Sequence, residues 1–144
     1  MSREVPSREG YRVFYPITTR WSDNDIYGHI NNVIYYSYFD SVANRYLIEE
    51  GGLDIGDGSI VGYVVDSGCK YHAPLAYPQK LEAGLCVEKL GNSSVRYGIA
   101  IFAEGEQRAS AHGHFVHVFV ERAVNRSVPI PENLRSALER LLVA

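Results

Sequence analysis

One change in the spacing of apolar side chains limits the folds that this chain can adopt. Residues 11–21 alternate apolar and polar side chains with a period of two, which is typical of a β-strand. Over residues 31–52 the apolar side chains recur every three or four positions, which predicts a single long helix. Either Asn31 or Asn32 can cap the start of this helix, and the glycine pair at 51–52 supplies a left-handed residue for its end.

Most of the remaining chain is predicted to form strands. The candidate strands are apolar or alternating runs bounded by glycine, proline or turn-like sequences, and they are residues 59–74, 79–91, 93–105 and 108–123. Within the last run, residues 115–120 are apolar on both faces, so both faces should be covered. A single helix covers only one face of a sheet, and the other face then needs a partner such as a second copy of the chain.

The order of these elements is that of an α+β domain. A strand comes first, the long helix follows, then several strands, and Pro131 with helically spaced leucines predicts a short final helix. We therefore expect an antiparallel sheet wrapped around a central helix, with the first strand near an edge because Pro16 cannot donate to a ladder. The whole of 1–144 is expected to be one domain, with a polar N-terminal extension at 1–9 and the C-terminal helix within 129–144.

Net charge and hydropathy limit the binding partners and the cellular location that we expect for this chain. A formal net charge of −3 gives no general attraction to nucleic acid or to an anionic membrane. The sequence shows neither a secretory apolar core nor a stretch long enough to span a membrane, so we expect a cytoplasmic protein. Cys69 and Cys86 both lie in apolar runs and are expected to be buried, inert thiols.

The sequence lacks the motifs and spacings that several kinds of ligand-binding site require. The glycine-rich phosphate-binding loops of dinucleotide and P-loop enzymes are missing. His112 and His114 should share one strand face while His117 lies on the other, so the three cannot meet at one metal ion. We therefore expect no metal site.

The segment DNDIYGHINN, residues 23–32, lies where the first strand gives way to the helix. Carboxylates just before a helix place a base or nucleophile beside unsatisfied backbone N–H groups and the positive end of the helix dipole. An acyl-transfer site needs this arrangement, because the amides stabilise an oxyanion and Gly28 lets a substrate approach the backbone. The same residues also fit a simpler role, in which Asp23 and Asp25 make turn hydrogen bonds and cap the helix.

Residues 20–47 resemble the Asp-x-Asp-x-x-Gly-His-Val-Asn-Asn signature of hotdog-fold acyl-CoA thioesterases, in the 4-hydroxybenzoyl-CoA thioesterase-like group, with Ile30 in place of Val. The similarity extends over nearly all of the chain after its first few residues. The resemblance implies a hotdog fold, in which about five antiparallel strands wrap around the central helix, and assembly into homodimers or homotetramers. It also implies an acyl-CoA substrate and no cofactor, since coenzyme A enters only as part of the substrate.

The resemblance implies roles for individual residues. Asp25 matches the catalytic carboxylate, which acts either as nucleophile or as base for a water, whereas Asp23 is implied to be structural. Four residues are expected to form or support the oxyanion-binding loop: Gly28, His29, Asn31 and Asn32. For His29, a direct catalytic contribution and a purely structural one both stay open. Possible substrate-lining residues are Tyr27, Tyr35, Ser93 and Ser94, and the candidates for holding coenzyme A phosphates, on charge alone, are Lys70, Arg96, Arg122 and Arg126.

Two functions from different classes remain at this point. The first is an acyl-CoA thioesterase that uses Asp25, with acyl carrier protein thioesters as an alternative substrate. The second is a non-catalytic hotdog domain that binds an acyl or aromatic ligand, or a protein partner. The intact Asp25 favours the enzyme.

Overall fold

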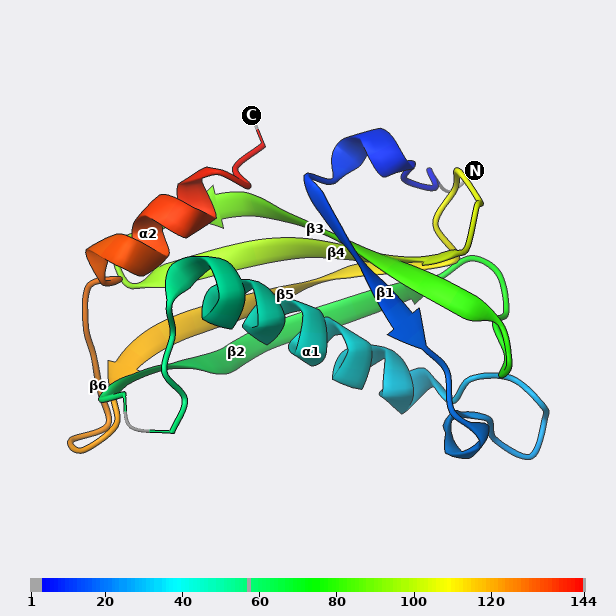
Figure 1. Cartoon of the computed structure of the whole chain (residues 1–144), viewed down its shortest axis with the longest axis horizontal. Coiled ribbons are helices and arrows are strands. Elements are labelled where there is room, and N and C mark those ends of the chain that lie inside the picture. Colours follow the sequence, from blue (N-terminus) through cyan, green and yellow to red (C-terminus); the bar gives the residue numbers. More distant parts are fainter. Residues whose placement is uncertain (1–3, 57, 144) are drawn as a thin grey trace.

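The computed structural model describes residues 4–56 and 58–143 and shows one curved sheet around a long helix (Figure 1). The strands are β1 (Val13–Thr18), β2 (Ile60–Tyr71), β3 (Lys80–Leu90), β4 (Ser94–Ala103), β5 (Ala111–Glu121) and β6 (Arg126–Ser127). They run antiparallel in the order β1-β3-β4-β5-β2, and the short β6 pairs with β5. The edge position predicted for the first strand is confirmed, and β2 forms the opposite edge.

Helix α1 (Asn32–Gly51) lies against the concave face of the sheet (Figure 1). Its buried side chains, among them Phe39 and Leu47, join inward-facing side chains of β3, β4 and β5, such as Leu85, Ile99 and Phe119, in one apolar core. Burial of this apolar area is the main force that holds the helix in the curve of the sheet. The hotdog fold expected from the sequence is confirmed.

Both helix caps follow the sequence prediction. The Asn31 side chain accepts a hydrogen bond from the backbone N–H of Val33 at the start of α1. At the other end, Gly52 adopts a left-handed conformation with a φ of 71°. Of the two residues weighed at each end, Asn31 and Gly52 are therefore the caps.

The final helix, α2 (Glu132–Glu139), packs at the C-terminal end of α1. The buried Tyr46 hydroxyl donates to the carbonyl of Ala137, and the Arg135 guanidinium donates to the carbonyl of Gly91 in the turn between β3 and β4. These bonds tie α2 both to α1 and to the sheet. The C-terminal helix predicted from the leucine spacing is confirmed.

The first described residues cover part of the convex face of the sheet. Val5 and Tyr11 pack in a second apolar cluster that includes Ala109, and the Ala109 N–H donates to the Pro6 carbonyl at 3.0 Å. The expected polar extension is therefore partly built into the fold, while its residues 1–3 lie outside the described part of the chain.

The two thiols differ in their surroundings. Cys86 is buried as expected, but Cys69 is only half-buried, because it lies on the edge strand β2. Desolvation raises the pKa of both thiols to about 11, so both stay protonated at neutral pH. No helix within residues 4–56 and 58–143 combines the length and the apolar character needed to cross a membrane.

Candidate active site

A short 3₁₀ turn, η2 (Trp21–Asp23), separates β1 from the loop before α1. The sequence predicted a strand as far as Trp21; this is wrong, because β1 ends at Thr18. The turn is closed by two bonds that involve the backbones of Asp23 and Arg20. The Asp23 carboxylate accepts from the Arg20 backbone N–H at 3.0 Å, and the Asp23 N–H donates to the Arg20 carbonyl at 2.9 Å.

Asp23 is fully buried and accepts hydrogen bonds from three directions. Its Oδ1 binds the Arg20 guanidinium at 2.9–3.0 Å, its Oδ2 accepts from the Tyr38 hydroxyl at 2.7 Å, and its backbone carbonyl accepts from the Asn31 N–H at 2.9 Å. Burial acts to raise the pKa of this carboxyl, but the bonds from Tyr38 and Arg20 outweigh burial, so its pKa is lowered. Asp23 thus fixes the loop to the helix while shielded from solvent.

Asp25 lies in the tight loop that follows, where it is half-buried. Its Oδ1 accepts from the Tyr27 backbone N–H at 2.9 Å, and its own backbone N–H donates to the His29 carbonyl at 2.9 Å. The loop closes through Gly28, whose N–H donates to the Asp25 carbonyl and whose φ of 84° suits glycine far better than any other residue. The loop therefore holds Asp25 next to His29.

The start of α1 presents one unused backbone donor. The N–H groups of Val33 and Ile34 bind the side-chain and backbone oxygens of Asn31, at 3.2 and 2.9 Å. The N–H of Asn32 donates to no other residue within the described part of the chain. This donor lies at the positive end of a 20-residue helix, where backbone N–H groups attract negative charge.

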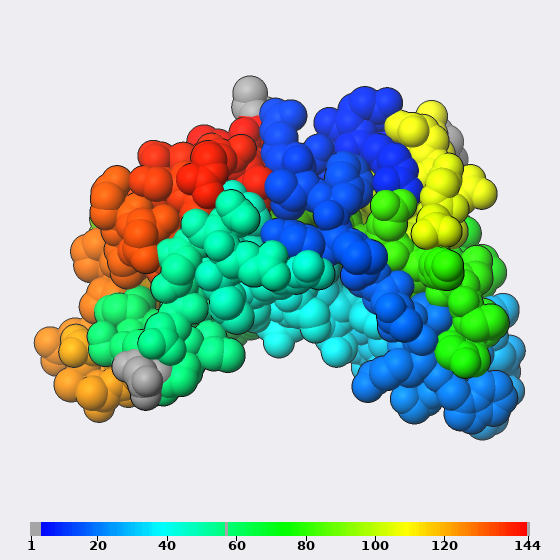
Figure 2. Space-filling model, in the orientation of Figure 1, coloured from blue at the N-terminus to red at the C-terminus, as the bar shows by residue number. Residues whose placement is uncertain are grey.

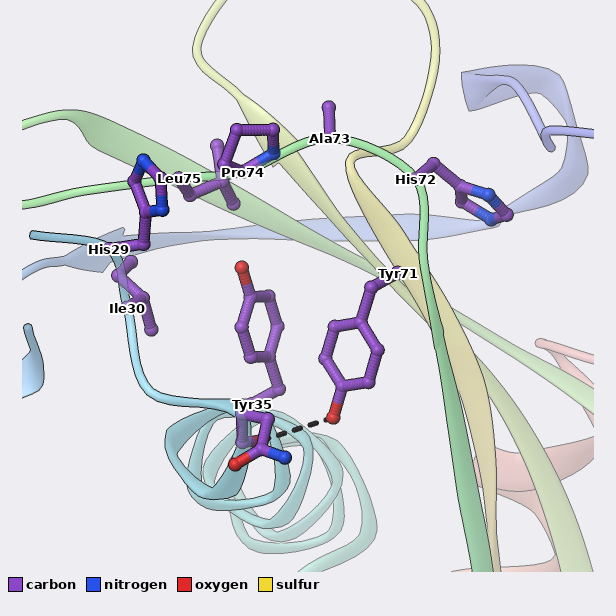
Figure 3. A pocket seen from close by; sticks show the side chains of 9 residues that line it. His29, Ile30, Tyr35, Tyr71, His72, Ala73, Pro74 and Leu75 are labelled. Carbon is purple, nitrogen blue, oxygen red and sulfur yellow. Dashed lines mark hydrogen bonds between the residues drawn. The ribbon is translucent and has the colours of Figure 1, made fainter. Parts of the chain in front are cut away.

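A pocket of about 350 Å³ opens at the start of α1, and Asn32 is among the residues that line it (Figure 3). Its walls are His29, Ile30, Asn32, Tyr35, Tyr71 and the segment 72–75. The Tyr35 and Tyr71 rings meet edge to face with centroids 5.1 Å apart. The Tyr71 hydroxyl turns to the helix and donates to the Asn32 carbonyl at 3.2 Å, whereas the Tyr35 hydroxyl points away from the helix and into the pocket (Figure 3).

The structure brings some of the predicted site residues together and separates others. His29, Asn32 and Tyr35 line the pocket, and Asp25 does not, although its backbone is bonded to His29. Tyr27 is 82% exposed. Ser94 begins β4 and Ser93 precedes it, in the turn to which Arg135 of α2 donates, and neither lines this pocket.

Tyr71 and the segment 72–75 form half of the pocket, and sequence reasoning missed them. The residues next to Tyr71 in the sequence do not identify it as part of a site. Its bond to Asn32 joins residues 39 positions apart and forms only because the end of β2 packs against the start of α1. An aromatic residue at the end of an apolar strand is the sole hint in the sequence.

The remaining histidines and cations lie elsewhere. His112 and His114 face outward from β5 and His117 faces the core, as predicted, and the described residues include no group of three His, Cys, Asp or Glu placed to hold a metal ion. None of the four cations considered for coenzyme A phosphates lines the pocket at the helix start; Arg96, for example, pairs with Glu88 at 2.8 Å.

Comparison with known proteins adds family and fold evidence. A family model described as the thioesterase-like superfamily matches residues 19–138. The PA5185 protein from Pseudomonas aeruginosa is 57% identical, with a TM-score of 0.97 over 98% of this chain and 99% of that one. The PA2801 protein of the same organism is 28% identical, with a TM-score of 0.81 over 93% and 98% of the two chains.

More distant structures share the fold alone. Slr0204 from Synechocystis, a 1,4-dihydroxy-2-naphthoyl-CoA thioesterase, is 18% identical, with a TM-score of 0.76 over 87% of this chain and 93% of that one. No curated protein sequence matches the chain significantly.

Proposed function

The chain belongs to the thioesterase-like superfamily of thioester hydrolases, and we propose that it hydrolyses an acyl-CoA to a carboxylic acid and free coenzyme A. One observation carries this proposal: Asn32, whose N–H at the positive end of α1 is unused within the described residues, lines a pocket together with His29, which is bonded to Asp25. A thioester carbonyl placed against this N–H would gain stabilisation as its oxygen becomes negative.

Asp25 supplies the attack in this proposal. As a base, its carboxylate takes a proton from a water whose oxygen bonds to the carbonyl carbon. The tetrahedral intermediate then breaks its C–S bond, and the thiolate leaves and takes up the proton to give coenzyme A. As a nucleophile, the carboxylate would itself bond to the carbonyl carbon and expel the thiolate, and water would then hydrolyse the resulting anhydride.

A single turnover in ¹⁸O-labelled water tests the nucleophilic route. Hydrolysis of an anhydride at the side-chain carbon places ¹⁸O in the Asp25 carboxylate, whereas a base, or hydrolysis at the acyl carbon, leaves the protein unlabelled, so label in Asp25 establishes the covalent route. Mass spectrometry of the loop peptide is the readout.

Release of free thiol from a panel of short, long, branched and aryl acyl-CoA thioesters tests the proposed function. Asp25→Asn keeps the shape of the side chain and removes its charge, and we expect it to lose nearly all turnover. Asp54→Asn is the matched control, because the Asp54 carboxylate likewise accepts from a backbone N–H two positions ahead, that of Gly56 at 3.0 Å, but lies after the far end of α1. Full turnover by Asp25→Asn would refute the role of Asp25. Tight binding of an acyl-CoA without release of thiol would favour a non-catalytic binding domain. Faster release of thiol from acyl carrier protein thioesters than from acyl-CoA would show that the substrate is carried by acyl carrier protein and not by coenzyme A.

We also propose that two copies pair along β2. This 12-residue strand is an edge of the sheet, and its Val64 and Val65 side chains are 44% and 60% exposed. Long apolar edge strands readily pair with another strand. Next to this edge the surface is hollowed beneath α1, which offers room for the matching part of a second copy (Figure 2). Two such dimers would form the homotetramer.

A further inference from the structure

The Tyr35 side chain is almost entirely buried, at 3% exposed, yet its hydroxyl has no hydrogen-bond partner in residues 4–56 and 58–143. Buried tyrosine hydroxyls usually find a partner, because an unmet donor in an apolar setting costs free energy. The neighbouring buried Tyr38 follows this rule, since it binds Asp23, and even the more exposed Tyr71 binds Asn32.

The hydroxyl of Tyr35 is not sealed inside the core. The one fully enclosed side-chain atom without a partner in the described part of the chain is Nε2 of His117, so the Tyr35 oxygen keeps access to the pocket. Figure 3 shows it pointing between His29 and Tyr71, toward Pro74 and Leu75, where the wall is apolar. Beside the His29 imidazole, the Tyr35 hydroxyl is therefore a directed polar group at a largely apolar wall of the pocket.

We propose that Tyr35 determines substrate specificity by hydrogen bonding a hydroxyl or keto oxygen on the acyl group of the thioester. This inference rests on the proposed function and adds the chemical class of the acyl group: compact, apolar in its body and carrying an oxygen beyond the thioester carbonyl. The Asn32 N–H and the Tyr35 hydroxyl serve different atoms of the substrate, because the hydroxyl points away from the helix start.

Tyr35 would discriminate between the two kinds of substrate because a buried O–H group without a hydrogen-bond acceptor costs free energy. When a substrate enters whose acyl oxygen lies within reach, that oxygen replaces water as the acceptor of the hydrogen bond from the Tyr35 hydroxyl. When the analogue without oxygen enters, water is displaced and the hydroxyl is left without a partner. Burial raises the pKa of Tyr35 to about 12, so the hydroxyl keeps its proton at neutral pH and can donate.

Matched pairs of thioesters test the inference. Butyryl-CoA is compared with 3-hydroxybutyryl-CoA, and benzoyl-CoA with its hydroxylated form, in the wild type and in Tyr35→Phe. We expect the wild type to prefer the oxygen-bearing member of at least one pair by roughly 10- to 100-fold in kcat/KM. Tyr35→Phe should lower that ratio to about one, chiefly by slowing the oxygen-bearing substrate.

A second variant separates specificity from stability. Tyr46→Phe also removes a buried tyrosine hydroxyl, one that donates to Ala137 at the far end of α1. It should lower the melting temperature and leave the substrate ratio unchanged. An unaltered ratio in Tyr35→Phe, or an equal loss for both members of each pair, would overturn the role of Tyr35.

The outcome for Tyr35 is distinguishable from that of the proposed function. If no thioester releases thiol, acyl-CoA hydrolysis fails, and calorimetric titration of the same pairs onto Asp25→Asn, with and without Tyr35→Phe, still decides the inference. Selective loss of affinity for the oxygen-bearing ligand on removal of the Tyr35 hydroxyl supports it, and equal affinities throughout refute it.

Discussion

The hydroxyl of Tyr38 donates a 2.7 Å hydrogen bond to Oδ2 of Asp23, and this contact joins the second turn of α1 to the loop in front of it. The same aspartate accepts from the Asn31 N–H through its backbone carbonyl. Asp23 therefore sets where the helix starts, and with it the direction of the Asn32 N–H on which the proposed oxyanion site depends.

Removal of the Tyr38 hydroxyl should destabilise the fold. In Tyr38→Phe the buried Asp23 carboxylate loses a donor, and the expected cost is about 2 kcal/mol in the free energy of unfolding, as for a bond to a charged group. Urea denaturation at pH 7 measures this. Tyr27→Phe removes an exposed hydroxyl and should stay within about 0.5 kcal/mol of the wild type, and equal effects of the two variants would contradict the role of the contact.

The stabilising effect of Asp23 should disappear in acid. Because its pKa is lower in the folded protein than in the unfolded chain, its contribution is fully present above the unfolded pKa of about 3.9 and is lost as pH falls through the folded value. Asp23→Asn should therefore be less stable than the wild type at pH 7, with a gap that narrows below about pH 4. Urea midpoints of both proteins across this range give the answer, and a gap independent of pH would show that charge is not the cause.

The sequence predicted those features that depend on neighbours along the chain. The long helix follows from apolar spacing within a few turns, its cap at Asn31 from a side chain that reaches only to Val33, and its end at Gly52 from a local φ requirement. The strands follow from alternation, but burial does not alternate along β4: Val95, Tyr97 and Ile99 join the main core, while Ala100 and Phe102 on the other face are covered by the N-terminal residues.

Features that depend on distant partners escaped prediction. The turn at Trp21–Asp23 is closed by local bonds between Arg20 and Asp23, but the burial of Asp23 that goes with it also depends on Tyr38, 15 positions away. Tyr71 joins the pocket only through tertiary packing against α1.

His117 should make the wild type less stable in mildly acidic solution. Burial lowers the pKa of this imidazole to about 4, whereas in the unfolded chain it takes up a proton near pH 6.5. Between these values the unfolded state binds more protons, so stability falls as pH drops from about 6.5 to 4, by roughly 3 kcal/mol at most.

The variant His117→Phe removes the titrating imidazole, so its free energy of unfolding should depend less on pH than that of the wild type. Urea unfolding at several pH values from 7 to 4 measures the difference from the wild type. Phe119→Leu alters the core beside the same ring without removing a titrating group, so its stability should be lower at every pH with the slope of the wild type. Identical slopes for His117→Phe and the wild type would mean that the buried imidazole titrates alike in both states.

Gly28 should be needed because the loop requires a positive φ at this position, and not because a larger side chain would clash. An added Cβ would meet nothing within 4 Å, so Gly28→Ala tests only the cost of a φ of 84°, about 1–2 kcal/mol. The loop can relieve that strain by moving Asp25, and we expect thiol release to fall by roughly 10- to 100-fold. Gly10→Ala, which also meets nothing within 4 Å but has no positive φ, should leave both stability and turnover unchanged. A Gly28→Ala enzyme with full turnover would show that Asp25 does not depend on this turn.

A charge on the edge strand should separate the proposed dimer. In Val64→Lys an ammonium group replaces an apolar side chain of β2 that is 44% exposed in the isolated chain and would be covered by the second copy. Burying an unpaired charge there costs more than the contact provides, so sedimentation velocity should show a shift toward monomer. Val124→Lys introduces the same charge at a similarly exposed valine in the turn after β5, and it should sediment like the wild type. If Val64→Lys keeps the sedimentation coefficient of the wild type, the copies do not meet along β2. If it becomes monomeric and keeps full thiol release, the pocket at the start of α1 is complete within one chain.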